Sequence, residues 1–412
     1  MPVEPCKSDV TVTQKSSQAI YQILCALLSS QGEKIAWGDQ SDLDWESLAE
    51  KARSEGVAPL LYWKVRGLKP AGTAGTALEA SPASLEKLKS EYYNTAANNG
   101  VLYEELTRIL EVLAHDQIPV IVLKGAALAA DLYADPALRP MGDLDLLIRE
   151  EDLERAIPRV EGLGYRLEGA LRGLNPDLRR RIHSEVNFQG GQQIPVHLEI
   201  HWSLIGGRES HYRPEIEWFW AQTDPWNAPG KMGIANVFAL KPTAHLLYLM
   251  AHLILKHGEG QDSLRWYYDL HLLIERRGEQ IKWQTLLLQA KAFHWEAALG
   301  PALSGIVERF GSAVPAEVLA AVPGSAIPSA GANLPKTDVE KTLAELADLT
   351  WATRMRLILA LIFPSRETML WRYQPKAGWT WPLYYPYRWV GILKAGVVHI
   401  SRKLSQKVRR SF

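Results

Sequence analysis

The sequence has few cysteines and no long apolar run. Its 412 residues include two cysteines, Cys6 and Cys25, which by themselves make neither a disulfide framework nor a cysteine-rich zinc site. A membrane-spanning helix needs roughly 18 consecutive apolar residues, and the apolar runs here are shorter or interrupted by His, Lys or Arg. Residues 1–17 lack the apolar core of a signal peptide. We therefore expect a cytoplasmic protein that does not span a membrane.

The sequence also lacks an excess of charge of either sign, because 46 Lys and Arg residues balance 46 Asp and Glu residues. This balance excludes a uniformly basic nucleic-acid-binding protein, and we expect no DNA binding. The charges are unevenly spread: residues 368–412 hold nine basic residues and no acidic one, whereas the first 367 residues hold 37 basic and 46 acidic residues. The chain thus combines a moderately acidic body with a basic tail.

The tail 388–412 would carry an apolar stripe with basic flanks if it formed a helix. Such a helix suits a weak contact with an anionic membrane surface. It also suits a contact with the protein's own acidic body, which is the interpretation that we prefer on the sequence alone.

The apolar pattern divides the chain into helical and mixed regions. Helical spacing dominates residues 16–66 and 84–116, and it returns after residue 242, whereas short strands alternate with helices over 118–204. Segments rich in Gly, Ala, Ser and Pro predict linkers at 67–83 and 323–337. The expected regions are an N-terminal helical region (1–100), an α/β core (101–235), a C-terminal helical domain (236–322), and a linker, helix and basic aromatic tail (323–412).

Two aspartates on a predicted strand give the first chemical signal. The strand Asp143–Ile148 alternates, so that Asp143 and Asp145 share one face while Leu144 and Leu146 share the buried one. Two neighbouring carboxylates repel each other unless a cation lies between them, and Mg²⁺ suits such a pair. Alternatively, the pair is a solvated strand face or a capping pair.

A second polar strand lies further along the chain. In Val196–Trp202, the alternation puts His197, Glu199 and His201 on one face. If this strand pairs beside Asp143–Ile148, Glu199 becomes a third carboxylate for a metal-dependent phosphoryl-transfer site. The alternatives are an exposed polar face or a zinc site, although positions i, i+2 and i+4 on one strand are poor geometry for three ligands.

A strand end that turns into a helix gives the third signal. Lys124 and Gly125 follow the predicted strand Pro119–Leu123. Glycine lets the backbone approach a ligand, and the helix N-terminus offers N–H groups to a phosphate. Lys124 and Arg139 would supply positive charge. Alternatively, Gly125 ends the strand for conformational reasons alone.

These motifs resemble a known family. The run IVLKGAALAADLYADPALRPMGDLDLLI, the strand VHLEIHW and the later segments HLLYLMAHLILKHG and LRWYYDLHLLIE are similar to the uncharacterised bacterial nucleotidyltransferase family of the polymerase-β-like superfamily. The resemblance implies an α+β fold, in which a small mixed sheet with flanking helices is embedded in N- and C-terminal helical regions. It makes Gly125 the turn glycine, Asp143 and Asp145 the metal pair, and Glu199 the third acid.

The resemblance also implies a reaction, the transfer of a nucleoside monophosphate from an NTP to an unidentified hydroxyl acceptor, with Mg²⁺ or Mn²⁺ as cofactor. The acceptor would be a small molecule, a sugar or a protein. An RNA acceptor would need a basic groove, and the acidic body of the chain argues against one. Lys-Gly-Ala stands where the superfamily has Gly-Ser, so we expect Lys124 and Arg139 to take over the phosphate contact. The alternative is a catalytically inactive member that serves as a nucleotide-binding or scaffold module.

Further polar residues lie in the predicted C-terminal helices. His245, His252, Lys256 and His257 lie along one predicted helix, where they would contact a metal or phosphate or form hydrogen bonds at a helix interface. Asp269 would pair with the residue four positions before it or shape an acceptor pocket.

Overall fold

The computed structural model describes residues 8–29, 44–66, 81–168, 174–230, 233–257, 263–322, 349–375, 377–391 and 394. Most of the predicted linker 67–83, the whole of 323–337 and most of the tail 388–412 lie outside the described residues. Among the helices that the structure describes, none is long and apolar enough to cross a lipid bilayer.

A mixed sheet of seven strands forms the centre of the described structure. The strands are β1 Val120–Val122, β2 Asp143–Leu147, β3 Arg166–Leu167, β4 Glu185–Gly190, β5 Val196–His201, β6 Thr223–Pro225 and β7 Val237–Leu240. Their order is β3-β4-β5-β2-β1-β7-β6, with β2–β5 and β1–β7 parallel and the other pairs antiparallel. The small mixed sheet expected from the sequence is confirmed. Strands β4 and β5 form an antiparallel hairpin within it.

Two strands were not predicted from the sequence. β6 contains Pro225 and lies at the edge of the sheet, where a proline is tolerated. β7 is a short apolar run that pairs with β1, so the sheet extends past residue 235. Short apolar runs do not distinguish a strand from a buried helical segment.

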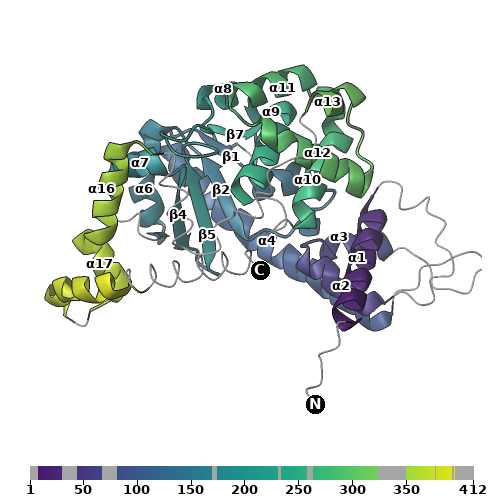
Figure 1. The fold of residues 1–412 in the computed structure, drawn as a ribbon, viewed down its shortest axis with the longest axis horizontal. Coiled ribbons are helices and arrows are strands. Elements are labelled where there is room, and N and C mark those ends of the chain that lie inside the picture. The colour runs from purple at the N-terminus through teal and green to yellow at the C-terminus, as the bar shows by residue number, and fades with distance from the viewer. Residues whose placement is uncertain are drawn as a thin grey trace, which may run out of the picture.

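Helices cover both faces of the sheet (Figure 1). The α-helices of the described structure are α1 Ser8–Leu28, α2 Trp45–Ser54, α3 Ala58–Val65, α4 Pro82–His115, α5 Lys124–Asp131, α6 Leu153–Gly162, α7 Pro176–Ile182, α8 Ile216–Ala221, α9 Pro242–Ala251, α10 Leu264–Arg277, α11 Trp283–Ala292, α12 Glu296–Phe310, α13 Ala316–Ala321, α16 Trp351–Ile362 and α17 Arg366–Tyr373. Short 3₁₀-helices occur at Pro136–Leu138, Glu150–Asp152, Gly278–Gln280 and Gly378–Leu383.

Capping side chains explain where several helices begin. Asp44 accepts a hydrogen bond from the backbone N–H of Ser47 and so caps the start of α2. Ser81 caps the long helix α4 in the same way, and Pro82 occupies its first turn, where no backbone donor is needed. Helix α4 runs from the N-terminal helices to the sheet (Figure 1).

Buried apolar residues form two clusters, and β2 contributes to both of them. Leu144 and Leu146 pack with the C-terminal half of α4 and with α5 and α6. Leu147 belongs instead to a cluster that joins α1–α3 with α9–α12. The predicted helical regions 1–100 and 236–322 therefore share one core, in which α1 packs on α12. The polar face of β2 is directed towards α9 and α10.

Candidate active site

The register between β2 and β5 brings the predicted acids together. The strands are parallel neighbours, with Asp143 opposite His197 and Asp145 opposite Glu199. Opposite residues of paired strands project from the same face, so Asp143, Asp145 and Glu199 lie on one side of the sheet. The strand pairing that the three-carboxylate interpretation required is therefore confirmed.

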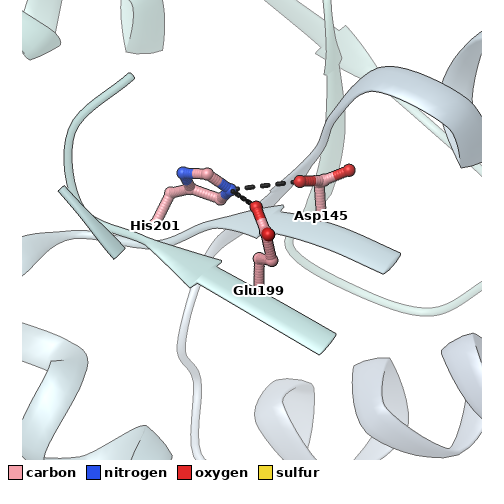
Figure 2. Close-up of side chains that lie close together, drawn as sticks. All are labelled: Asp145, Glu199 and His201. Atoms are coloured by element: carbon pink, nitrogen blue, oxygen red, sulfur yellow. Dashed lines mark hydrogen bonds and ion pairs between the residues drawn. The ribbon is translucent and has the colours of Figure 1, made fainter. Parts of the chain in front are cut away.

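His201 joins two of these acids. Its Nε2 atom lies 3.2 Å from Oδ1 of Asp145 and 3.2 Å from Oε2 of Glu199 (Figure 2). His201 is fully buried, and Asp145 is 2% exposed. The alternation of β5 placed His201 on the polar face, but its bridging position depends on the neighbouring strand and was not predicted.

Lys124 supplies a positive charge to the same acids. Its ammonium group donates a hydrogen bond of 2.6 Å to Oδ1 of Asp145 and lies 3.5 Å from Oε2 of Glu199. Lys124 is the first residue of α5, and its φ of +43° lies in the left-handed region that a lysine seldom adopts. The strained position of the turn is therefore Lys124 and not Gly125. Strain of this kind is typical of functional sites.

The pKa values of the acids differ because their partners differ. Burial alone would raise the pKa of Asp145, but the charge of Lys124 and the hydrogen bond of His201 hold it well below its usual value. Burial would lower the pKa of His201, but hydrogen bonds to Asp145 and Glu199 raise it. Burial and the charge of Asp145 raise the pKa of Asp143. Asp145 is thus held ionised inside the protein.

Arg139 is held by a buried acid from the C-terminal helices. Its Nε and Nη2 atoms donate hydrogen bonds of 2.9 and 2.7 Å to the two carboxylate oxygens of Asp269 in α10. The hydroxyl of Tyr133 donates a further bond of 2.7 Å to Asp269. Asp269 therefore pairs with Arg139, a partner that was not predicted, and it lines the cavity; its role in an acceptor pocket stays a prediction.

Gly125 is needed for the close approach of Arg139. A Cβ atom at Gly125 would lie 2.6 Å from Nη1 of Arg139 and 3.3 Å from Cγ of Met141. From its position after the strand, we expected this glycine to make room for a ligand. In the structure, the space beside it is occupied by the arginine side chain.

A cavity of about 150 Å³ lies between the sheet and the C-terminal helices. Its sheet side includes the predicted residues Lys124, Gly125, Arg139, Asp143 and Glu199. Its helical side includes His252, Lys256, His257, Arg265, Trp266 and Asp269. The cavity thus brings together most of the residues that the sequence analysis selected, from segments that are far apart in the chain.

The helix behind this cavity departs from the prediction of one long α-helix. Helix α9 ends at Ala251, and residues His252–His257 form a π-helix. Since hydrogen bonds in a π-helix join residues five apart, His252 and His257 come together, with ring centroids 4.6 Å apart. His257 also contacts Trp266, at 4.5 Å between centroids. Burial lowers the pKa of His252 well below its usual value and that of His257 to about 4.

An ion pair connects this π-helix with the sheet. Lys256 donates a hydrogen bond of 2.7 Å to Glu185 of β4. Burial opposes ionisation of Glu185, but the nearby charges of Lys256 and His201 lower its pKa to about 2. His201 Nδ1 lies 3.6 Å from Glu185. Both nitrogens of the His201 ring thus face carboxylates.

The residues present fit a divalent cation. One oxygen of Asp145, one oxygen of Glu199 and a ring nitrogen of His201 lie within 4.8 Å of one another. Carboxylate oxygens suit both Mg²⁺ and Mn²⁺, whereas imidazole nitrogen is a ligand more typical of Zn²⁺ and other transition metals. The two carboxylates thus suit Mg²⁺ or Mn²⁺, and His201 holds both of them through its Nε2 atom.

Acids on neighbouring parallel strands, beside a cavity with basic side chains, are typical of enzymes that transfer phosphoryl groups. The model of a family described as uncharacterised nucleotidyltransferase matches residues 41–311. This match covers well over half of the chain, so the protein belongs to that family. The family resemblance inferred from the sequence is confirmed.

No curated protein matches the chain. Among solved structures, the chain is similar to JHP933 from Helicobacter pylori, with 15% identity and a TM-score of 0.28, over 65% of this chain and 94% of that one.

Proposed function

We propose that this protein transfers a nucleoside monophosphate from an NTP to a hydroxyl group of a small molecule, a sugar or a protein, and releases pyrophosphate. The observation that carries the proposal is the pairing of Asp145 with Glu199 across β2 and β5, beside a cavity that Asp143 also lines. Membership of a nucleotidyltransferase family supports the general class of reaction. The cytoplasm remains the predicted compartment.

The three acids are the proposed ligands of Mg²⁺ or Mn²⁺. When bound, the cation would lower the pKa of the attacking hydroxyl and neutralise charge on the phosphates. The cavity wall includes Glu199 and Asp143, whereas Asp145 lies deeper and is 2% exposed. Glu199 is therefore the proposed group nearest the acceptor, as a ligand or as the general base that takes the hydroxyl proton.

The basic residues are the proposed contacts of the triphosphate. Lys124 Nζ contacts Asp145 and lies 3.5 Å from Glu199 beside the cavity, so it would be the ammonium group that contacts a phosphate oxygen there. Arg139 uses Nε and Nη2 on Asp269, so Nη1, which lies beside Gly125, is the nitrogen proposed for the phosphate. Positioning and charge neutralisation would then supply most of the rate enhancement.

The test of this mechanism is a labelled-NTP transfer assay on the variant Asp143→Asn/Asp145→Asn. We expect incorporation into the acceptor to be lost, since the amides retain the shape of the acids without their charge. Asp177→Asn is the matched control, because Asp177 lies in α7, where it pairs with Arg181 and Arg208. Unchanged incorporation in the double variant would contradict the mechanism.

A screen of the four NTPs with Mg²⁺ or Mn²⁺ would identify the substrate. Pyrophosphate release is followed while candidate acceptors with free hydroxyl groups are added. The active combination should also raise the melting temperature, because a ligand that binds only the native state stabilises it.

The second candidate is an inactive family member that binds nucleotides or serves as a scaffold. The hydrogen bond between Lys124 and Asp145 favours it, because the acid is neutralised by the chain itself. The absence of the Gly-Ser hydroxyl in Lys-Gly-Ala points the same way. Stabilisation by an NTP without pyrophosphate release, across the whole acceptor screen, would favour this candidate.

A further inference from the structure

Exposed apolar side chains are concentrated in one C-terminal part of the described structure. Among the described residues, eleven large hydrophobic side chains are exposed, and nine of these lie between residues 351 and 390. The nine are Trp351, Met355, Leu359, Phe363, Trp379, Leu383, Tyr387, Trp389 and Val390. Such a concentration marks an interaction surface, since isolated exposed apolar residues would be spread over the molecule.

Helix α16 presents one apolar stripe away from the protein. Trp351, Met355 and Leu359 are four residues apart and therefore lie on one side of the helix, where Trp351 is 76% exposed. The other side is anchored, because Thr353 is buried and donates a hydrogen bond of 2.6 Å to Glu209. Helices α16 and α17 lie at the edge of the molecule opposite the N-terminal helices (Figure 1).

The stripe continues into an ordered aromatic group. The ring of Phe363, at the end of α16, lies 6.2 Å from that of Tyr385 and 5.7 Å from that of Trp389. The indole N–H of Trp389 donates a hydrogen bond of 3.0 Å to the carbonyl of Ile362, and Arg388 donates to the carbonyl of Leu361. The exposed rings are thus held in place by α16, and the stripe and rings form one surface.

The segment that carries this surface has an excess of positive charge. Residues 349–394 contain seven Lys or Arg residues and one acid, Glu367, and residues 395–412 add five basic residues and no acid. Two copies of the surface would therefore repel each other. The exposed large hydrophobic residues elsewhere in the described chain, Tyr93 and Leu288, offer no matching apolar patch on a second copy.

We propose that the surface formed by α16 and residues 379–390 binds the headgroup region of a membrane rich in anionic lipid. Tryptophan and tyrosine are enriched at the membrane–water interface, where the ring contacts the lipid and its polar group contacts water. Basic residues are attracted by anionic headgroups. Because none of the described helices is long and apolar enough to cross a bilayer, the protein would lie on the membrane and not span it. This proposal takes up the membrane alternative for the tail 388–412, which was not the one preferred on the sequence alone, and extends it to the helix before the tail. It is independent of the proposed catalysis.

The test is co-sedimentation of the full chain with phosphatidylcholine vesicles and with vesicles that also contain phosphatidylglycerol. We expect binding to the anionic vesicles, weakened by salt because the headgroup attraction is screened. The variant Trp351→Ser/Trp379→Ser/Leu383→Ser should bind at least tenfold more weakly. All three side chains are exposed, so the fold is expected to be retained, which circular dichroism would verify.

The matched control is Tyr93→Ser/Leu288→Ser, which removes exposed apolar side chains outside this surface. It should bind the vesicles as the unmodified protein does. Absence of binding to anionic vesicles, or equal binding by the triple variant, would overturn the proposal. So would a stable dimer that the triple variant dissociates, since the surface would then be an interface between two copies.

Discussion

The ammonium nitrogen of Lys124 lies 2.6 Å from Oδ1 of Asp145 and 3.5 Å from Oε2 of Glu199. The chain thus provides its own cation for two of the acids proposed to bind a metal. Burial would lower the pKa of Lys124, but the charge of Asp145 raises it well above its usual value, so this charge is permanent at neutral pH. A divalent cation at this site must compete with Lys124.

The first prediction concerns this competition. Lys124→Met should tighten Mn²⁺ binding by at least about tenfold, because an opposing charge about 4 Å away contributes several kcal/mol even when it is partly screened. Electron paramagnetic resonance of free Mn²⁺ measures the affinity without any assay of activity. Lys256→Met is the control, because Lys256 pairs with Glu185. Equal or weaker Mn²⁺ binding by Lys124→Met would show that Lys124 does not occupy the cation position.

The second prediction concerns the buried pair of Arg139 and Asp269. Asp269→Asn should lower the free energy of unfolding by about 3–5 kcal/mol, because it leaves a buried guanidinium without its counter-charge. Denaturant unfolding measures the change. The double variant Arg139→Met/Asp269→Leu should lower the free energy of unfolding by less than the sum of the decreases measured for Arg139→Met and Asp269→Leu alone. Strict additivity would mean that the two residues do not depend on each other.

The third prediction concerns Gly125. Gly125→Ala should destabilise the protein by about 1–3 kcal/mol, because the added Cβ would lie 2.6 Å from Arg139 Nη1. Helix propensity alone favours alanine by up to about 1 kcal/mol, so the sign of the change distinguishes the two effects. Gly142→Ala is the control, since nothing lies within 4 Å of its Cβ position. Thermal unfolding measures both variants, and a more stable Gly125→Ala would refute the close contact.

The fourth prediction concerns pH. Burial lowers the pKa of His245 to about 4, against an opposing effect of the Asp269 charge. The unfolded chain therefore takes up a proton at this site near pH 6.5, whereas the folded protein does so only near pH 4. The contribution of His245 to the free energy of unfolding is therefore fully present above pH 6.5. It decreases by about 3 kcal/mol at most as the pH falls towards 4.

His245→Gln removes this titration, so its stability should fall less between pH 6.5 and pH 4 than that of the unmodified protein. His115→Gln is the control, because the side chain of His115 is 84% exposed. Melting temperatures across this range compare the three proteins. Parallel pH profiles for His245→Gln and the unmodified protein would contradict the assignment.

Local patterns predicted much of the α/β core. The alternation in the predicted strands Asp143–Ile148 and Val196–Trp202 placed the acids on one face of each strand, and the structure has them there. These features depend on residues close together in the chain. For the same reason, capping by Asp44 was predictable.

Contacts between distant segments were not predictable in this way. Arg139 meets Asp269 from a different helix, and no periodicity connects them. The bridging position of His201 depends on a neighbouring strand. Lys124 was expected to face a phosphate, but the direction of its long side chain is set by the acids around it. The π-helix after Ala251 has no signature in an apolar pattern that also fits an α-helix.

The parallel pairing of β2 and β5 also determines where the chain tolerates insertion. Residues added between the two strands, in loops or at the hairpin turn, leave Asp145 opposite Glu199. One residue added inside β5 would turn Glu199 to the apolar face and bring a leucine or isoleucine beside Asp145. Length variation among relatives should therefore be frequent between the strands and absent within them.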